Sequence, residues 1–481
     1  MGAAPAPPDD LSGLTAAVAR FVAALRFEDL GDEVLRMSRR CILDGLGVML
    51  AGSEQPGMAP LERLLRRMGG SADSRVVGDA AWRLPAPLAA LWNGTAGHAM
   101  DWDDTQLAEG PGRPYGLLMH PTVPPLAASL AVADLMAGER ASPIGGEEFL
   151  VAFNAGFEVA CKIAEAINRD HYMRGFHTSG TIGTFGAAAS AARILGLGAA
   201  ATARAIGIAA SMAAGIRTNF GSMTKPLHVG RAAENGVTAA LLAREGFTAN
   251  EAALDGPWGY LAVAGPGGDP ASVRERLGDP FTIVAPGVLI KPYPSGVLTH
   301  PSMDAMLFLM RENGLTAEDI ESVTLRAGRN VLGPIRFRVA RTELEGKFSF
   351  AFLLSAIILR GRAGKAEFSE AFVSSAECQA MQARIHTAFD QAIEDMGWEQ
   401  IRSRLEVRTR DGRLLTRAAD ENYRGGPRNP LSDREVEAKF RDCAEGLLAD
   451  DRIRRIEAMV WSFERLPDVS ELLPLLSWKG R

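Results

Sequence analysis

The sequence predicts a mainly α-helical protein, in which a large all-helical domain formed by both chain ends carries an inserted, smaller α+β lid domain. Three observations predict this. Residues 14–246 keep apolar side chains at three- and four-residue spacing almost throughout. The middle of the chain contains segments rich in β-branched residues between helical segments, and helical spacing returns near the C-terminus. We therefore expect a division into residues 1–268, 269–424 and 425–481.

The composition is that of an ordinary folded protein and excludes several classes. Hydrophobic residues make up 47% of the 481 residues and charged residues 23%, which argues against intrinsic disorder. A net charge of −6 gives no electrostatic footprint for nucleic acid or an anionic membrane. The four cysteines form no CxxC pair, and no apolar stretch is long enough to span a bilayer. Without a signal-peptide pattern at the N-terminus, we predict a cytoplasmic protein with no nucleic-acid or membrane partner.

The N-terminal part is expected to be a bundle of long helices. The apolar spacing predicts helices over residues 35–50, 85–100, 121–136, 147–167, 183–197, 201–214 and 230–244. The last three are rich in Ala and Gly, and such small residues let helix axes approach closely. Gly246 stands where a left-handed residue ends the last of these helices.

The inserted part is expected to alternate strands and helices. An Asp-Gly pair between alternating apolar runs is typical of a hairpin turn, and one stands at residues 411–412. The expected strands are 282–290, 320–327 and the hairpin 405–415, and the expected helices are 301–312 and 348–360. After a glycine-rich hinge at 425–427, Ser432 and Glu435 form a capping box for a last helix over 436–448.

Histidine is scarce, and six of the seven histidines lie in or next to polar or glycine-containing loops. The exception is His386, which falls in an amphipathic helical pattern typical of a surface position. His98 and Asp101 are three residues apart at a predicted helix end, so they share a face, and Asp103 and Asp104 follow. Such closely spaced carboxylates cannot all be buried and ionised without cations or hydrogen-bond donors nearby. The segment is either a solvated helix end or a catalytic or metal-binding corner.

Two further segments could act on an anion. His120 directly precedes a predicted helix, which places an imidazole on a loop held by a rigid scaffold. His177, Thr178 and Ser179 stand in a run of Gly, Ser and Thr that enters another helix, where backbone N–H groups can bind a carboxylate. The alternative for this second segment is a helix start that caps itself.

Two groups of cationic and aromatic residues complete the candidates. Lys225, His228 and Arg231 lie within seven residues, and such a cluster either binds an anion or is a charged surface. Lys291 and Tyr293 lie in a loop stiffened by prolines. This loop is either a structural crossover or a route that carries both side chains into an interdomain cleft.

In this order, these segments resemble the MmgE/PrpD family, which includes 2-methylcitrate dehydratase, cis-aconitate decarboxylase and iminodisuccinate epimerase. The resemblance covers nearly the whole chain and rests on the strings GHAMDWDDT, HPTVPPLAASLAVAD, GFHTSGTIGTFGAAASAARILGL, MTKPLHVGRAAENGVTAALLAREGFT, KPYPSG followed by His300, and GGPRNPLSDREVEAKF. It implies a helical domain with an α+β lid, a homodimer, and chemistry on a small di- or tricarboxylate without cofactor or metal.

The resemblance also implies which residues form the active site. The family's positions map onto Asp101, Thr105, His120, His177, Lys225 and Lys291. Two departures stand out. Residues 110–115 lengthen the link before the predicted helix at 121, so we expect a different pocket rim. In the same loop, decarboxylase-type members resemble Lys-Arg-Phe-Pro-Ala-His, in which the His is functional, and Gly296 stands at the position of that His. The glycine favours a reaction other than cis-aconitate decarboxylation.

We therefore expect a cofactor-independent lyase that abstracts a proton next to a carboxylate, most like a 2-methylcitrate dehydratase. The alternatives are a dicarboxylate isomerase or epimerase and a cis-aconitate decarboxylase. Less favoured are a metal-dependent hydrolase, whose ligands would be His98 and the three nearby aspartates, and a binding protein without activity.

In this scheme each candidate residue has a role. Lys225, Lys291 and the turn over 177–184 bind substrate carboxylates and stabilise developing negative charge, with His228 and Arg231 adding positive charge. One of the imidazoles of His120 and His177 moves the proton. Finally, Asp101 orients that imidazole, Thr105 positions the substrate, and Tyr293 is a candidate donor to the leaving group.

Overall fold

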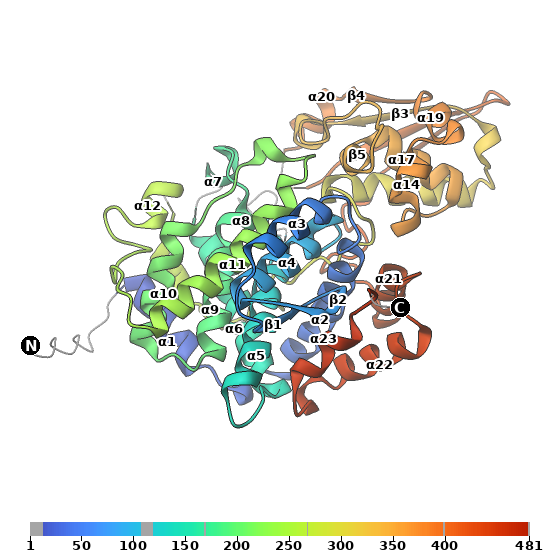
Figure 1. Ribbon diagram of the computed structural model, residues 1–481. Coiled ribbons are helices and arrows are strands. Elements are labelled where there is room, and N and C mark those ends of the chain that lie inside the picture. The colour runs from blue at the N-terminus through green and yellow to red at the C-terminus, as the bar shows by residue number, and fades with distance from the viewer. Residues whose placement is uncertain (1–12, 107–118, 168–169, 267, 398–399, 480–481) are drawn as a thin grey trace, which may run out of the picture.

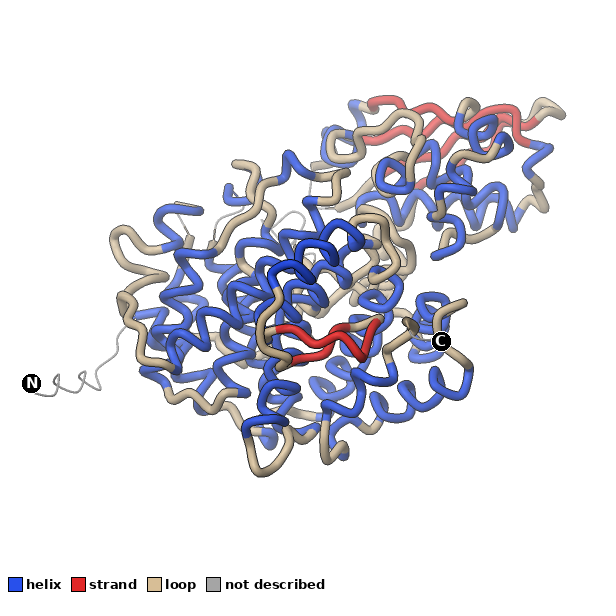
Figure 2. The backbone as a smooth tube through the Cα atoms, in the orientation of Figure 1, coloured by secondary structure: helices blue, strands red, loops and turns tan. Residues whose placement is uncertain are grey.

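The computed structural model describes residues 13–106, 119–167, 170–266, 268–397 and 400–479. It shows a mainly α-helical protein with two small sheets (Figures 1 and 2), as the sequence predicts. None of the helices in these ranges combines the length and the apolar character needed to cross a membrane.

The larger part of the molecule is a bundle of long helices. Its members are α1 (Gly13–Ala24), α2 (Asp32–Gly52), α3 (Met58–Met68), α4 (Ala86–Ala99), α5 (Val123–Glu139), α6 (Gly146–Ala166), α9 (Gly183–Ile194), α10 (Ala199–Met212) and α11 (Thr224–Arg244). α4 packs against both α2 and α11, and α9 packs against α5, α6 and α11. Gly94 of α4 faces Gly230 of α11, and a Cβ added at Gly230 would lie 2.0 Å from Oγ1 of Thr95. The predicted close approach of small-residue helices is thus confirmed.

A four-stranded sheet lies at one end of the molecule (Figures 1 and 2). Its strand order is β4-β3-β5-β6, with β3 parallel to β4 and antiparallel to β5, and β5 antiparallel to β6. The strands are β3 (Ile320–Ala327), β4 (Ile385–Phe389), β5 (Ser403–Thr409) and β6 (Leu414–Ala418). The helices α14 (His300–Glu312) and α17 (Phe350–Arg360) pack against the sheet, α14 against β5 and β6 and α17 against β4, and Leu405 and Val407 of β5 are buried.

The C-terminal segment returns to the helical bundle. α21 (Asp433–Ala444) packs against α2, and α22 (Asp450–Trp461) and α23 (Leu472–Leu475) follow, so red and blue ribbons meet in Figure 1. The capping box is confirmed, because the backbone N–H of Ser432 donates to the carboxylate of Glu435, and the Ser432 hydroxyl accepts from the backbone N–H of Glu435. The domain boundaries after residues 268 and 424 stay predictions.

Short helices connect these elements. They are α7 (Asp170–Met173), α8 (Thr178–Thr181), α12 (Tyr260–Ala264), α13 (Pro270–Arg274), α15 (Arg329–Leu332), α16 (Glu343–Gly346), α18 (Glu370–Val373), α19 (Ala376–Gln382) and α20 (Gln391–Asp395).

The strand predicted over residues 282–290 is wrong. The segment is made of turns, and its backbone groups bind elsewhere: Thr282 donates its N–H to the carboxylate of Glu158. Leu289 pairs with Thr105 only as an isolated bridge. β-branched side chains favour a strand, but no neighbouring strand is placed beside this segment to complete a ladder.

Two other local predictions also fail. The N-terminal part is not all-helical, because β1 (Ser74–Val76) and β2 (Asp79–Leu84) form an antiparallel hairpin. Its first strand is too short for a period-two pattern to be recognised in the sequence. His386 lies in β4, where it pairs with Thr324, and not in a helix; its predicted exposure is confirmed.

Candidate active site

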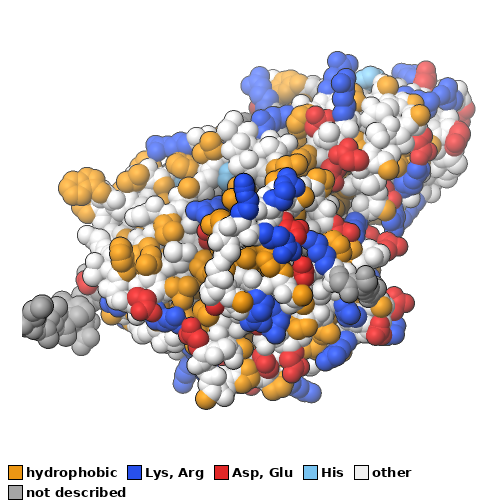
Figure 3. Space-filling model, in the orientation of Figure 1, with side chains coloured by type: hydrophobic (Ala, Val, Ile, Leu, Met, Phe, Trp, Pro, Cys, Tyr) orange, Lys and Arg blue, Asp and Glu red, His pale blue; other side chains and the backbone are white. Residues whose placement is uncertain are grey.

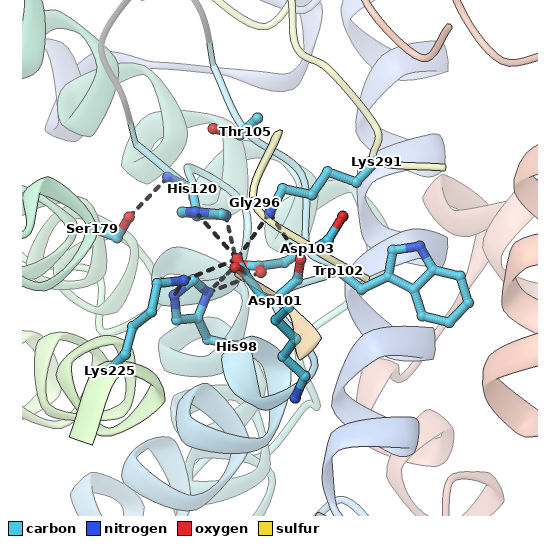
Figure 4. Close-up of polar contacts among 12 residues, drawn as sticks. His98, Asp101, Trp102, Asp103, Thr105, His120, Ser179, Lys225, Lys291 and Gly296 are labelled. Atoms are coloured by element: carbon cyan, nitrogen blue, oxygen red, sulfur yellow. Dashed lines mark hydrogen bonds and ion pairs between the residues drawn. The ribbon is translucent and has the colours of Figure 1, made fainter. Parts of the chain in front are cut away.

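Four segments far apart in the sequence bring their polar side chains together between the helical bundle and the loop that leads to α14. They are the end of α4 with the turn after it, the loop before α5, the first turn of α11, and the proline-rich loop (Figure 4). The side chains that meet here are called the central cluster: His98, Asp101, Asp103, His120, Lys225 and Lys291.

Asp101 occupies the centre of this cluster. Its φ of 52° places it in the left-handed region, and no other described residue apart from glycines has a positive φ. Aspartate tolerates this conformation better than most residues, and such strain concentrates at functional sites. Oδ1 of Asp101 accepts from Nζ of Lys225 and from Nζ of Lys291, each at 2.9 Å. Burial alone would raise the pKa of Asp101, but these two ammonium groups outweigh it and hold the pKa well below its usual range.

His98 connects Asp103 to Lys225. Nδ1 of His98 lies 2.9 Å from both carboxylate oxygens of Asp103, and Nε2 lies 2.9 Å from Nζ of Lys225. Burial lowers the pKa of His98 to about 3, despite the opposing charge of Asp103. The imidazole is therefore neutral at pH 7. A neutral ring has one N–H, which the carboxylate holds at Nδ1, so Nε2 accepts from the lysine.

His120 and His177 differ in their surroundings. Nδ1 of His120 lies 3.2 Å from Oδ2 of Asp103, its backbone N–H donates to Oγ of Ser179 at 3.0 Å, and 12% of its side chain is exposed. His177 is buried, and its Nδ1 lies 3.1 Å from Nδ1 of His228. Burial, with the nearby charges of the cluster, lowers the pKa of His177 well below its usual range. His120 is thus the imidazole with access to solvent protons.

Four residues of the central cluster line a small cavity of about 70 Å³, here called the inner cavity; they are Asp101, His120, Lys225 and Lys291. Its lining residues are Asp101, Thr105, His120, Tyr172, His177, Phe220, Lys225, Lys291, Gly296, Val297, Leu298, Pro334, Ile335 and Phe348. All six positions expected from the family resemblance are therefore brought together. The aromatic walls were not expected, since single aromatic residues in loops give no sequence signal.

The aromatic wall changes the chemistry of Lys225. Its Nζ lies 5.3 Å from the ring centre of Phe220 and 5.7 Å from that of Phe348. Burial lowers the pKa of Lys225, although Asp101 opposes this effect. The lysine is thus a desolvated cation that gains from a second anionic partner.

Five other predicted residues do not line the inner cavity. Ser179 and His228 lie one layer behind it, against His120 and His177, as the contacts above show, and Thr178 is buried at the start of α8. Arg231 is exposed and pairs with Glu234. Their substrate-binding roles stay predictions, and residues 110–115 of the expected pocket rim lie outside the described residues.

Tyr293, the fifth of these residues, points into a different polar group. Its buried hydroxyl donates to Oδ1 of Asp304 at 2.6 Å and lies 3.3 Å from a guanidinium nitrogen of Arg424, which donates to it. These contacts connect the proline-rich loop to α14 and to the hinge before α21. The predicted role as donor to a leaving group stays untested, and the position favours a structural role.

Two buried residues at the site were absent from the expected carboxylate-binding set. The sequence places His98 in a predicted catalytic or metal-binding corner, and its spacing to Asp101 indicates a shared face, but the predicted scheme gives His98 no role in carboxylate binding. Nζ of Lys347 donates to the carbonyl of Ala99 at 2.8 Å, at the end of α4. Nothing in the surrounding sequence distinguishes this lysine from a surface one.

The metal alternative can be tested against the donor set. One ligand atom from each of His98, Asp101, Asp103 and His120 lies within 4.8 Å of the others, a spacing that a divalent cation could use. However, both nitrogens of His98 are already engaged, and two ammonium groups bind Asp101, as described above. A cation here would have to displace a lysine, so these residues do not fit a metal in this arrangement.

Asp104, the remaining residue of the metal alternative, points away from the cluster. It accepts from the hydroxyl of Thr122 at 2.6 Å. Burial, together with the neighbouring carboxylates of Asp44 and Asp103, raises the pKa of Asp104 to about 8. It is thus mostly protonated at pH 7 and is a poor metal ligand.

Comparison with known proteins shows the family of the chain. Residues 16–272 match the MmgE/PrpD N-terminal domain and residues 293–465 match the MmgE/PrpD C-terminal domain. The chain is 29% identical to cis-aconitate decarboxylase of Homo sapiens over 97% of this chain and 95% of that protein. It is 25% identical to cis-aconitate decarboxylase of Aspergillus terreus over 97% of this chain and 96% of that protein. With both domains matched and the expected residues gathered around one cavity, the chain belongs to the MmgE/PrpD family, as an enzyme of the lyase or isomerase kind.

Proposed function

We propose that this enzyme is a cofactor-independent carboxy-lyase that removes CO2 from cis-aconitate or from a tricarboxylate of the same shape. The observation that carries the proposal is the convergence of Lys225 and Lys291 on Asp101 at the wall of the inner cavity. Full-length similarity to cis-aconitate decarboxylases supports decarboxylation over the 2-methylcitrate dehydration that the sequence motifs favoured.

The reaction places a specific demand on the protein. The bond between the saturated CH2 carbon and its carboxylate breaks, and CO2 leaves. The electron pair shifts across the neighbouring double bond, so that negative charge develops next to a second carboxylate, and a proton then adds at that carbon. Preorganised cations in a water-poor site stabilise such charge strongly.

The cluster residues can divide this work. Lys225 and Lys291 face the cavity as buried ammonium groups and stabilise the charge that develops on the remaining carboxylates. Asp101 accepts a hydrogen bond from each lysine and holds both side chains at the cavity wall. His120 returns the proton, because it is the imidazole of the cavity that reaches solvent, whereas a protonated His177 would be buried next to other cations.

One observation favours 2-methylcitrate dehydration as a second candidate. Gly296 lines the cavity at the position where decarboxylase-type members resemble a sequence with a functional histidine. Its φ of −55° suits any residue, and an added Cβ would lie 3.3 Å from Cδ1 of Ile335, a tight but adjustable contact. The backbone therefore does not require glycine here, and the missing side chain leaves room for a different substrate substituent.

The two candidates are separated by the mass of the product. Purified enzyme is incubated in parallel with cis-aconitate and with 2-methylcitrate, with EDTA present in both reactions, and the products are identified by mass spectrometry. Loss of CO2 from cis-aconitate supports the proposal. Loss of water from 2-methylcitrate, with cis-aconitate unchanged, would replace it by the second candidate.

A further inference from the structure

A second, larger hollow lies directly outside the inner cavity. This outer cavity of about 430 Å³ is lined by Tyr172, Met173, Gly175, Arg217, Thr218, Phe220, Leu298, Arg329, Asn330, Gly333, Pro334 and Arg336. It shares four wall residues with the inner cavity: Tyr172, Phe220, Leu298 and Pro334. The two hollows therefore adjoin each other at these four side chains.

The charged residues of the outer cavity all have the same sign. Its described lining contains three arginines and no acidic residue. The Arg217 guanidinium lies 3.6 Å from the ring centre of Tyr172, and that of Arg336 donates to the carbonyl of Phe220 at 2.8 Å. The backbone N–H of Arg329 donates to Glu394, and its guanidinium lies 5.1 Å from the ring centre of Phe389.

None of these three guanidinium groups forms an ion pair with a described carboxylate. Elsewhere on the surface the two signs are interspersed, as the view in Figure 3 shows. Arginine presents several N–H donors in a planar fork that matches a carboxylate. Three guanidinium groups without a described carboxylate partner, which keep further N–H donors free of the contacts given above, therefore form a site for an anion.

The sizes of the two cavities lead to the same conclusion. About 10–15 Å³ of such a cavity holds one water molecule. The 70 Å³ of the inner cavity therefore holds roughly five water molecules. A six-carbon tricarboxylate has more non-hydrogen atoms than this space can hold, so when its reacting group contacts the central cluster, the rest of the molecule needs the space of the adjoining outer cavity.

We propose that the outer cavity is a second carboxylate-binding site, in which Arg217, Arg329 and Arg336 capture a polycarboxylate and hold its distal carboxylate while the reacting end enters the inner cavity. This inference rests on the proposed function only for the identity of the substrate. The binding of a polycarboxylate can be measured without any turnover.

The test compares three proteins by calorimetry with tricarballylate, a saturated tricarboxylate, as the probe. They are the wild type, the double variant R329Q/R336Q, and the control R454Q/R455Q, which removes the same charge from exposed positions on α22. At low ionic strength the dissociation constant of the first variant should rise about tenfold, and its salt dependence should flatten. The control should bind like the wild type. R329K/R336K, which keeps the charge, should regain most of the affinity if charge and not folding is responsible.

Kinetics with cis-aconitate supply the second readout. The proposal predicts that KM of R329Q/R336Q rises more than kcat falls. Unchanged tricarballylate affinity in this variant, an equal loss in the control, or no binding to the wild type would each overturn the proposal. Inorganic phosphate that binds more tightly than tricarballylate at the same arginines would overturn the carboxylate assignment. If the wild type binds tricarballylate through these arginines but leaves cis-aconitate intact, the proposed function fails and the second site stands.

Discussion

Nζ of Lys225 lies 2.9 Å from Nε2 of His98, so the ammonium group that faces the inner cavity donates to a neutral imidazole as well as to Asp101. The other nitrogen of that imidazole is held by Asp103. The tautomer of His98 is therefore set by Asp103, and the tautomer in turn sets the direction of Lys225. This second layer fixes the position of a cation that would otherwise have several rotamers.

Asp103→Asn should reduce kcat by about 10- to 100-fold, as is typical when an orienting partner behind a functional group is removed. The amide can donate to Nδ1, which drives the His98 proton to Nε2 and turns the lone pair away from Lys225. Steady-state kinetics would show this loss, with a smaller change in KM. The matched control is Asp104→Asn, which lies outside the cavity and should keep kcat. Equal activity of both variants would contradict the tautomer argument.

Lys291→Met should reduce kcat/KM by about 100-fold or more, since one of the two cations that face the developing charge is removed. The variant should also raise the pKa of Asp101, because one of its two ammonium partners is lost. The measurement is turnover of cis-aconitate as a function of pH. Full activity of Lys291→Met would exclude this lysine from catalysis.

Tyr293→Phe should affect stability more than turnover. The change removes the hydrogen bond to Asp304 and leaves a buried carboxyl with one partner fewer, at a cost of about 1–3 kcal/mol. Urea unfolding measures the loss, and assays on the folded fraction measure kcat. If kcat instead falls sharply while the stability is unchanged, Tyr293 reaches the substrate, as its place in the loop sequence first suggested.

The stability of the protein should decrease as the pH falls below about 6.5. Burial lowers the pKa of His98 to about 3 and that of His171 to about 4, so the unfolded chain binds more protons than the folded chain in this range. Each such group costs about 1.4 kcal/mol per pH unit between its unfolded and folded pKa values. His171→Asn should make the slope of the unfolding free energy against pH shallower by about one proton. An unchanged slope would show that His171 is not buried in its neutral form.

The stability of Asp104→Asn relative to the wild type should be higher at pH 8 than at pH 4. The folded-state pKa of Asp104 is raised to about 8, so the folded chain keeps a proton that the unfolded chain releases above about pH 4. The free energy of unfolding of the wild type therefore falls as the pH rises through that window. The uncharged amide of the variant makes no such contribution. Thermal unfolding of both proteins across this range measures the difference. A constant difference would contradict the raised pKa.

The sequence predicted those parts of the fold that have a strong local signal. The long helices, the hairpin at residues 411–412 and the capping box at Ser432 depend on apolar spacing and on turn chemistry, which are properties of neighbouring residues. The segment 282–290 was mistaken for a strand because its β-branched residues say nothing about whether a partner strand is present. The hairpin β1–β2 was missed because its first strand, β1, has only three residues.

The site could be predicted in part for a similar reason. Asp101, His120 and Lys225 could be identified because histidine is scarce in this chain and because all three residues lie in polar segments next to predicted helices. The local helical pattern does not account for polar residues at these positions. Lys347 and the outer arginines could not be found this way. Their roles arise from tertiary neighbours, and lysines and arginines in a sequence are most often solvated.

The most direct test of the account is proton NMR of the EDTA-treated enzyme with cis-aconitate in D2O. If the carboxylate-binding lysines drive decarboxylation with a shift of the double bond, itaconate should form with one deuterium in the methylene group next to its carboxylate. The account would be contradicted by cis-aconitate that stays unchanged while the same enzyme sample eliminates water from 2-methylcitrate.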